Sequence, residues 1–343
     1  MKINIVGKTE HELNELIHEL DGQNSKIKEL SKAIYKKSTY NINEIINIPL
    51  KVRQALSEKY SIDVYPPVKE SQSSDGTRKY LFENKHGQQF ESVYMPGAKR
   101  NTLCISTQSG CRMGCKFCLT GKIDFNGNLS ASDILNQYLS IPVKDKVNRI
   151  VLMGMGEPFD NFVEIKKAVE IFTSQWGVAF GASNITLSSV GLHHPLKEFI
   201  NEPFCNLAIS LNNPFSDERK LLMPIETSNP IDKTIEMIKT KPLIKPLRIS
   251  FEYVALSNNN ISEKHAQEIA TLLKDINCHL NIIPWNCHDN PSFDSPTEIE
   301  LNDFISCLTK NGIRCTVRQS RGRDIGAACG QMAGERANKD TNK

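Results

Sequence analysis

The regular alternation of strand-like and helical segments after about residue 100 constrains the fold of this 343-residue chain more than any other feature. Short runs of β-branched and apolar residues alternate with segments in which apolar residues recur every three or four positions. Strands and helices that alternate in this way, joined by short connections, predict a parallel sheet with helices outside. Six such units are too few for a closed eight-fold barrel. We therefore expect an α/β fold with a partial (β/α)6 barrel, in which ligands bind at the carboxyl ends of the strands.

Seven strand-like runs and six helical segments make up this region. The expected strands lie within residues 102–107, 149–156, 184–191, 206–213, 247–256, 279–286 and 314–319. The expected helices lie within residues 130–141, 162–176, 194–200, 230–240, 262–276 and 297–312.

The chain before the barrel divides into two parts. Residues 1–65 are polar, and apolar residues at helical spacing predict a small helical accessory domain. Residues 66–100 begin with a junction rich in Pro, Ser and Gly and continue into two strand-like runs, so we expect a linker and a β-hairpin. The barrel is then expected over residues 101–334, followed by a polar tail at 335–343.

We expect a cytoplasmic protein and a monomer. Hydrophobic residues make up 39% and charged residues 24% of the chain, which is ordinary for a globular protein. No apolar run approaches membrane-spanning length, and the first residues lack the apolar core of a signal peptide. In the cytosol, ten cysteines indicate metal ligation or redox chemistry rather than disulfides. Residues 314–343 hold seven Lys or Arg against three Asp or Glu, which is either a contact for a phosphate-rich partner or a solvated terminus.

Three cysteines directly follow the first expected barrel strand, where such a barrel builds its active site. Cys111, Cys115 and Cys118, called the cluster cysteines below, have the spacing C-x3-C-x2-C. A closed structural zinc site needs four ligands, often as two C-x2-C pairs, and the sequence has no second pair. A buried helix stripe also fits the spacing, but Gly110 and Gly114 weaken a helix there. Three thiolates on a [4Fe–4S] cluster leave one iron open for a chelating ligand, and we favour this interpretation.

The segment around these cysteines resembles the signature of the radical S-adenosylmethionine (SAM) superfamily, with Phe117 at the usual aromatic position. Further segments make the chain similar to the RlmN/Cfr family of RNA adenosine methyltransferases, from residue 73 to about 334 and closest to its RlmN-like branch. These segments are LMGMGEP (152–158), LSSVG (187–191), ISLNNP (209–214), IIPWN (282–286) and DIGAACGQMAG (324–334). The most specific of them is AACGQ.

The resemblance implies a function and its cofactors. It implies a radical-SAM core that methylates a ring carbon of adenine. Carbon 2 is the expected target in preference to carbon 8. The substrate is ribosomal RNA, transfer RNA or both, with the target base unpaired or flipped out. The cofactors are a [4Fe–4S] cluster on the cluster cysteines and two SAM molecules per turnover, with an electron donor such as flavodoxin or ferredoxin. The helical head is expected to contact RNA.

Short polar residues at successive expected strand ends are the candidate SAM contacts. Glu157 follows a strand end, where its carboxylate can accept a hydrogen bond from the ammonium group of SAM. Serine and asparagine side chains at the next strand ends can bond ribose hydroxyls and adenine. The full set that matches the family's SAM contacts is Gly156, Glu157, Ser188, Ser210, Leu211, Asn212 and Asn286.

Three further residues match the family's catalytic groups. Cys329 lies among small residues and matches the cysteine that is methylated and then joined to the RNA base. Cys104 matches the second cysteine, which releases the product and leaves a disulfide with Cys329. Glu91 matches the proton acceptor. The remaining cysteines match no motif and are interpreted as structural: Cys205, Cys278, Cys287, Cys307 and Cys315.

Two positions depart from the family pattern, and two other functions stay open. Asn212 stands where the family usually has His, and Leu119 where Ala is common, so both are expected to reshape the SAM pocket. A second hypothesis keeps the cluster but gives the enzyme a protein or metabolite as methyl acceptor; Cys104 and Cys329 argue against it. A third is a zinc-stabilised RNA-binding module without catalysis.

Overall fold

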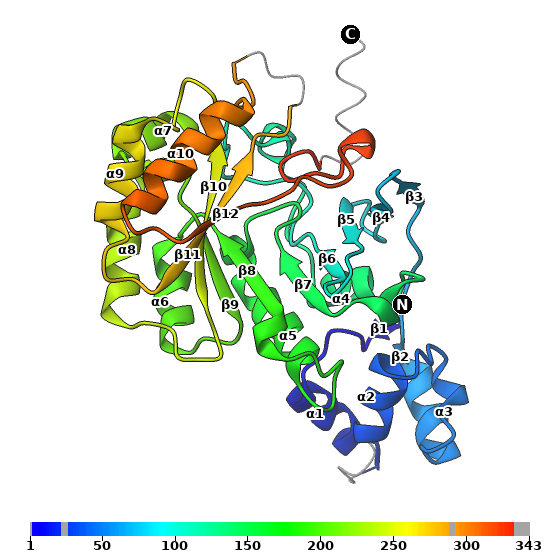
Figure 1. Ribbon diagram of the computed structural model, residues 1–343. Helices are drawn as coiled ribbons and strands as arrows, with labels where there is room; N and C mark the ends of the chain where they lie inside the picture. Colours follow the sequence, from blue (N-terminus) through cyan, green and yellow to red (C-terminus); the bar gives the residue numbers. More distant parts are fainter. Residues whose placement is uncertain (1, 22–26, 288–291, 333–343) are drawn as a thin grey trace.

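A sheet of ten strands runs through the protein, in the order β12-β11-β10-β9-β8-β7-β6-β5-β4-β3 (Figure 1). The computed structural model describes residues 2–21, 27–287 and 292–332. Strands β6 to β12 are parallel to their neighbours. These strands are β6 (Thr102–Cys104), β7 (Arg149–Leu152), β8 (Ile185–Ser189), β9 (Asn206–Ser210), β10 (Ile249–Ala255), β11 (Cys278–Pro284) and β12 (Cys315–Val317).

Helices lie along the outside of this curved parallel sheet (Figure 1). Their inward stripes of apolar residues pack on the sheet, and side chains such as Phe251 of β10 and Phe304 of the last helix are fully buried. The helices are α4 (Ala131–Leu139), α5 (Phe162–Thr173), α6 (His193–Asn201), α7 (Ser216–Leu222), α8 (Ile231–Thr240), α9 (Glu263–Leu272) and α10 (Glu298–Lys310).

The expected partial barrel is confirmed. Each of the seven strand-like runs contains a strand, and each of the six expected helical segments contains a helix. Helix α7 was not expected from the sequence. Because all seven strands are parallel, their carboxyl ends meet at one edge of the sheet, and the motif residues follow them there.

Three antiparallel strands extend the barrel sheet at the β6 edge. They are β3 (Lys69–Gln72), β4 (Arg78–Glu83) and β5 (Gln89–Met95). The expected hairpin corresponds to β4 and β5, which pair antiparallel. In the segment expected as a plain linker the structure has strand β3, which pairs with β4 across a turn at residues 73–77. The hairpin is thus continuous with the barrel, because β5 also pairs with β6.

The N-terminal head is helical, as expected, and also contains a short sheet that was not expected. The helices are α1 (Glu10–Asp21), α2 (Ile27–Tyr35) and α3 (Leu50–Lys59), and strand β1 (Ile3–Asn4) pairs with β2 (Tyr60–Ser61). Two-residue strands carry too little pattern to be recognised in a sequence.

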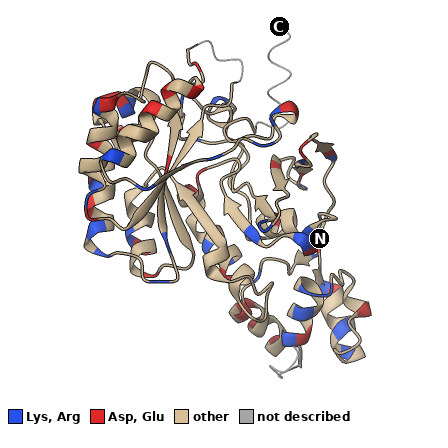
Figure 2. Ribbon diagram, in the orientation of Figure 1, with Lys and Arg blue, Asp and Glu red and all other residues tan. Residues whose placement is uncertain are grey.

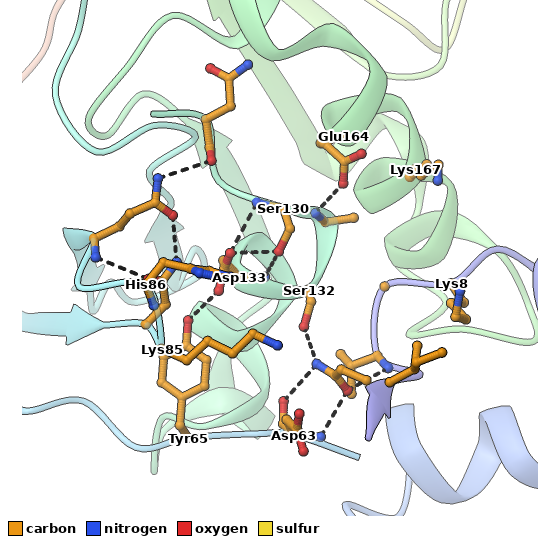
Figure 3. Close-up of a pocket in the computed structure, with 18 of the residues that line it drawn as sticks. Lys8, Asp63, Tyr65, Lys85, His86, Ser130, Ser132, Asp133, Glu164 and Lys167 are labelled. Atoms are coloured by element: carbon orange, nitrogen blue, oxygen red, sulfur yellow. Dashed lines mark hydrogen bonds between the residues drawn. The ribbon is translucent and has the colours of Figure 1, made fainter. Parts of the chain in front are cut away.

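A cavity of about 820 Å³ lies where the head, the β4–β5 turn and helices α4 and α5 meet (Figure 3). Its walls are joined by polar contacts between distant parts of the chain. Tyr65 Oη donates to Asp133 Oδ1 over 2.6 Å, and Lys167 Nζ lies 2.7 Å from Glu12 Oε1. These contacts attach the head to the barrel side that carries α4 and α5.

Charge is mixed over the head surface. Figure 2 shows Lys and Arg interspersed with Asp and Glu over its helices, and residues 1–65 contain ten Lys or Arg and nine Asp or Glu. Within the described ranges, no helix has the length and apolarity needed to cross a membrane.

Candidate active site

The three cluster cysteines lie on the loop that follows β6. Glycines allow this loop to turn tightly. Gly110 has a φ of +86°, and a Cβ atom there would lie 2.4 Å from the Asp124 carbonyl oxygen. A Cβ atom at Gly121 would lie 3.1 Å from the backbone N and O of Cys115. The backbone therefore closes around the cysteines in a way that side chains at these positions would disturb.

The cluster cysteines form one electrostatic group. Burial, with smaller contributions from the other two thiols, raises the pKa of Cys115 well above its ordinary value. Burial also raises the pKa of Cys111, to about 12, and that of Cys118. An apolar shell that includes Phe117, Met223 and Trp285 packs against the loop. Three half-buried, desolvated thiols that repel each other as thiolates fit a cationic metal group, which would stabilise the deprotonated form.

A [4Fe–4S] cluster binds each of its three thiolates to a different iron. Its ligands therefore need not converge on one point, as the ligands of a single ion do. In the part of the chain that the structure describes, no three His, Cys, Asp or Glu residues are placed to hold one metal ion. The cluster cysteines thus fit a cluster without forming a single-ion site.

Arg219 of α7 joins the strand ends next to the cluster cysteines, and no sequence motif indicated it. This side chain is fully buried. It forms an ion pair with buried Glu226. Its guanidinium also donates to the carbonyl oxygens of Leu211 (2.9 Å), Ser210 (2.9 Å) and Val190 (3.1 Å). The ends of β8 and β9 are therefore tied to one cation, which also lowers the pKa of Cys115.

Gly156 and Glu157 follow β7 and face the cluster loop. A Cβ atom at Gly156 would lie 2.5 Å from the Cβ of Gln108, so only glycine fits. Burial raises the pKa of Glu157 to about 7, although its carboxylate accepts hydrogen bonds from the backbone N–H groups of Val190 (2.9 Å) and Phe159 (3.0 Å). The carboxylate is thus held at the junction of β7 and β8.

The next predicted SAM contacts lie on β8, at the end of β9 and just after it. Ser188 and Ser210 are half-buried at these strand ends, and Leu211 is fully buried. Asn212 has a φ of +56°, a left-handed conformation that Asn adopts more readily than most residues. Its Oδ1 accepts from Val254 N (2.9 Å), so this side chain ties the end of β9 to β10.

Asn286 follows β11 and contacts the C-terminal loop, defined here as residues 318–332. Its Nδ2 donates to the Cys329 carbonyl oxygen over 3.1 Å, and its Oδ1 accepts from Arg323 Nε at the same distance. Leu119 N donates to the Gly330 carbonyl oxygen over 2.8 Å. The C-terminal loop therefore packs directly on the loop of the cluster cysteines.

Cys104 and Cys329 lie in one small cavity, although 225 positions separate them. The cavity measures about 30 Å³, room for about one water molecule, and Arg318 and Met153 also line it. Burial raises the pKa of Cys104 to about 12, with a smaller contribution from Cys329, whereas Arg318 lowers it. Arg318 Nη1 contacts Met153 Sδ at 3.1 Å. The guanidinium of Arg318 thus lies beside the two thiols. No sequence motif had indicated this arginine.

Glu91 shares a face of the sheet with Cys104. Val93 of β5 pairs directly with Cys104 of β6, and Glu91 lies two residues before Val93, on the same face. The Glu91 carboxylate is almost fully buried, and its Oε1 lies 3.1 Å from the ammonium group of Lys79. Among the other cysteines, Cys205 is buried and Cys287 is exposed.

The partial barrel and the cysteine-bearing loop after its first strand define a radical SAM enzyme. The Radical SAM superfamily matches residues 105–269 of the chain. A crystal structure of a radical SAM methyltransferase from Sphaerobacter thermophilus superimposes with a TM-score of 0.88 at 34% identity, covering 96% of this chain and 99% of that one. The cofactors are therefore a [4Fe–4S] cluster and SAM.

Close relatives narrow the class to one family. A protein of Phocaeicola vulgatus named probable dual-specificity RNA methyltransferase RlmN is 40% identical, over 99% of this chain and 97% of its own length. A protein of the same name from Parabacteroides distasonis is 41% identical, over 97% of each chain. The chain belongs to the RlmN family of radical SAM RNA methyltransferases. This membership favours the radical enzyme over the zinc-stabilised module.

Proposed function

We propose that this protein methylates an adenine ring carbon, carbon 2 ahead of carbon 8, in ribosomal RNA, transfer RNA or both. The observation that carries the proposal is the shared cavity of Cys104 and Cys329, next to Glu91 and the loop of the cluster cysteines. The two thiols share this cavity although they are distant in the chain, and the Glu91 carboxylate lies on the same face of the sheet as Cys104. The relatives' name, dual-specificity RNA methyltransferase, supports RNA as the acceptor.

The cluster cysteines and the carboxyl-end residues of β7 to β11 hold the two cofactors in this proposal. When bound, the cluster and SAM supply a methyl group and a 5′-deoxyadenosyl radical. The Glu157 carboxylate would accept a hydrogen bond from the SAM ammonium group. The other proposed contacts are Gly156, Ser188, Ser210, Leu211, Asn212 and Asn286. The apolar shell around Phe117 and Trp285 excludes water from this region.

Cys329 carries the methyl group, and its carbon becomes bonded to the adenine ring. A radical route suits methylation of the adenine ring, because its amidine carbons are electrophilic and do not attack a methyl donor. Glu91 takes the ring proton of the covalent adduct, and the unpaired electron left on the ring would pass to the [4Fe–4S] cluster, which would serve as its one-electron acceptor. Its burial and its fixed place beside β6 keep this base near the cavity.

Cys104 then releases the product by thiol–disulfide chemistry. As a thiolate it forms a bond with the Cys329 sulfur, and the S–C bond breaks. The electron pair of that bond stays with the carbon, which takes a proton and becomes the product methyl group. The two cysteines end oxidised as a disulfide, so a cellular thiol reductant must restore them.

The head and the residues around the C-terminal loop are proposed to contact RNA. The nearly balanced charge of the head predicts contacts through shape and a few lysines rather than through a strong field. Arg321 is half-buried and Arg323 is exposed beside the cavity, so they are the nearest candidate phosphate contacts. The remaining basic residues of the C-terminus, at 336, 339 and 343, lie outside the described residues. We further propose a monomer that receives electrons from flavodoxin or ferredoxin.

A trapping experiment tests the proposal. Cys104→Ala should accumulate protein covalently joined to RNA, seen as a nuclease-sensitive shift on a denaturing gel, because nothing breaks the S–C bond. Cys329→Ala should form neither adduct nor product while keeping its cluster. Cys307→Ala, at a half-buried thiol of α10, is the control and should behave as wild type. Absence of adduct in Cys104→Ala, with normal iron content and a methylated Cys329, would refute the mechanism.

A further inference from the structure

Two side-chain contacts of Lys79 connect the proposed proton acceptor to the loop of the proposed methyl carrier. Its ammonium group lies 3.1 Å from Glu91 Oε1 and donates to the Gly326 carbonyl oxygen over 3.3 Å. The lysine side chain is 19% exposed and the glutamate side chain 5%. This ion pair is therefore largely shielded from solvent, where charge-assisted bonds hold their geometry best.

The sheet register explains why Lys79 reaches both partners. Lys79 of β4 pairs directly with Val93 of β5, and Val93 pairs with Cys104 of β6. Directly paired residues share a face of the sheet, as do Val93 and Glu91, two residues apart on one strand. Lys79, Glu91 and Cys104 therefore all lie on the face that the C-terminal loop covers.

The turn between β3 and β4 binds the same loop at its start. Ser73 Oγ donates to Asp324 Oδ1 over 2.6 Å, and Gly322 N donates to Asp75 Oδ2 over 3.1 Å. A Cβ atom at Gly322 would lie 2.9 Å from Thr77 Cγ2, so the two segments are in close contact. The loop is thus attached to the β3–β4 hairpin at two places before it reaches Cys329, and Lys79 provides the second.

We propose that Lys79 is a positioning residue: its ammonium group fixes the Glu91 carboxylate relative to the C-terminal loop, so that proton acceptor and methyl carrier meet the same adenine. The proposal rests on the proposed function of Glu91 and Cys329. In this scheme Lys79 contacts neither RNA nor SAM and acts only through the Glu91 carboxylate. Methylation of Cys329 needs no Glu91, so only the steps on RNA depend on the link.

The test compares Lys79→Met with Lys79→Arg in anaerobically purified holoenzyme. Met removes the charge at similar length, whereas Arg keeps it. Lys79→Met should show normal iron content and fully methylated Cys329, and its kcat should fall about 100-fold with RNA KM within about twofold, because a small displacement of a reacting group costs about that much. Lys79→Arg should recover at least tenfold of the loss. Lys85→Met, in the exposed β4–β5 turn, should match wild type.

Three results would overturn the proposal. A kcat of Lys79→Met within threefold of wild type means that the link does not matter. Loss of Cys329 methylation means that Lys79 only stabilises the loop. A raised KM at unchanged kcat means that Lys79 binds RNA phosphate. Glu91→Gln and Cys104→Ala, measured in parallel, separate the two levels: a fully active Glu91→Gln without trapped adduct in Cys104→Ala rejects the proposed function itself.

Discussion

Removing the guanidinium of Arg219 should destabilise this protein more than any surface charge can. The group is fully buried, donates to three backbone carbonyls and pairs with Glu226, which is only 2% exposed. Breaking a buried ion pair from one side costs about 3–5 kcal/mol, because the remaining charge loses its partner. Carbonyls left without donors add to this, although such losses are not additive. We expect Arg219→Met to lower the free energy of unfolding by about 4 kcal/mol.

Equilibrium urea unfolding of the cluster-free protein, followed by circular dichroism under reducing conditions, measures this change. The cluster is left out because its loss would make unfolding irreversible. Lys166→Met is the control: Lys166 pairs with Glu202 at the surface over 2.9 Å, so its loss should leave the free energy of unfolding nearly unchanged. The double variant Arg219→Met, Glu226→Gln should regain part of the loss, because no buried charge is left alone. A loss below about 1 kcal/mol, or strict additivity in the double variant, would refute the reasoning.

Three further predictions follow from the site. Replacing any one cluster cysteine with Ala should abolish the brown colour and the activity; a full iron content in one such variant contradicts the assignment. The raised pKa of Glu157 means that its contribution to stability is present below about pH 4.5 and is lost as pH rises through about 7. Glu157→Gln should therefore flatten the pH dependence of unfolding between these values, by up to about 3 kcal/mol; an unchanged profile contradicts it. The double variant Arg321→Ala, Arg323→Ala should reduce the slope of log RNA affinity against log salt concentration by about 1.4. The control Arg314→Ala, at the opposite end of β12, should leave this slope unchanged. If both variants have the same slope, Arg321 and Arg323 have a structural role and do not contact phosphate.

The order of strands and helices could be predicted from the sequence because each depends on a local repeat. Period-two and helical spacing recur within each segment, and parallel strands need helices between them. The same locality explains the success with the loop of the cluster cysteines, whose three thiols are close in the chain. It also explains the misses: β1 and β2 are too short to show a period, and β3 lies in a segment dominated by turn-forming residues.

The tertiary structure alone showed which residues without a motif lie at the site. Arg219 lies in the polar segment SDERKLL and looks like a surface arginine, yet the fold buries it against the ends of two strands, β8 and β9. Lys79 and Arg318 carry no motif, and their partners lie 12 to 247 positions away along the chain. Local sequence patterns reflect the hydrogen bonds within a segment and which of its side chains face solvent. Charge pairing across a sheet depends on register and on loop closure, which only the folded chain sets.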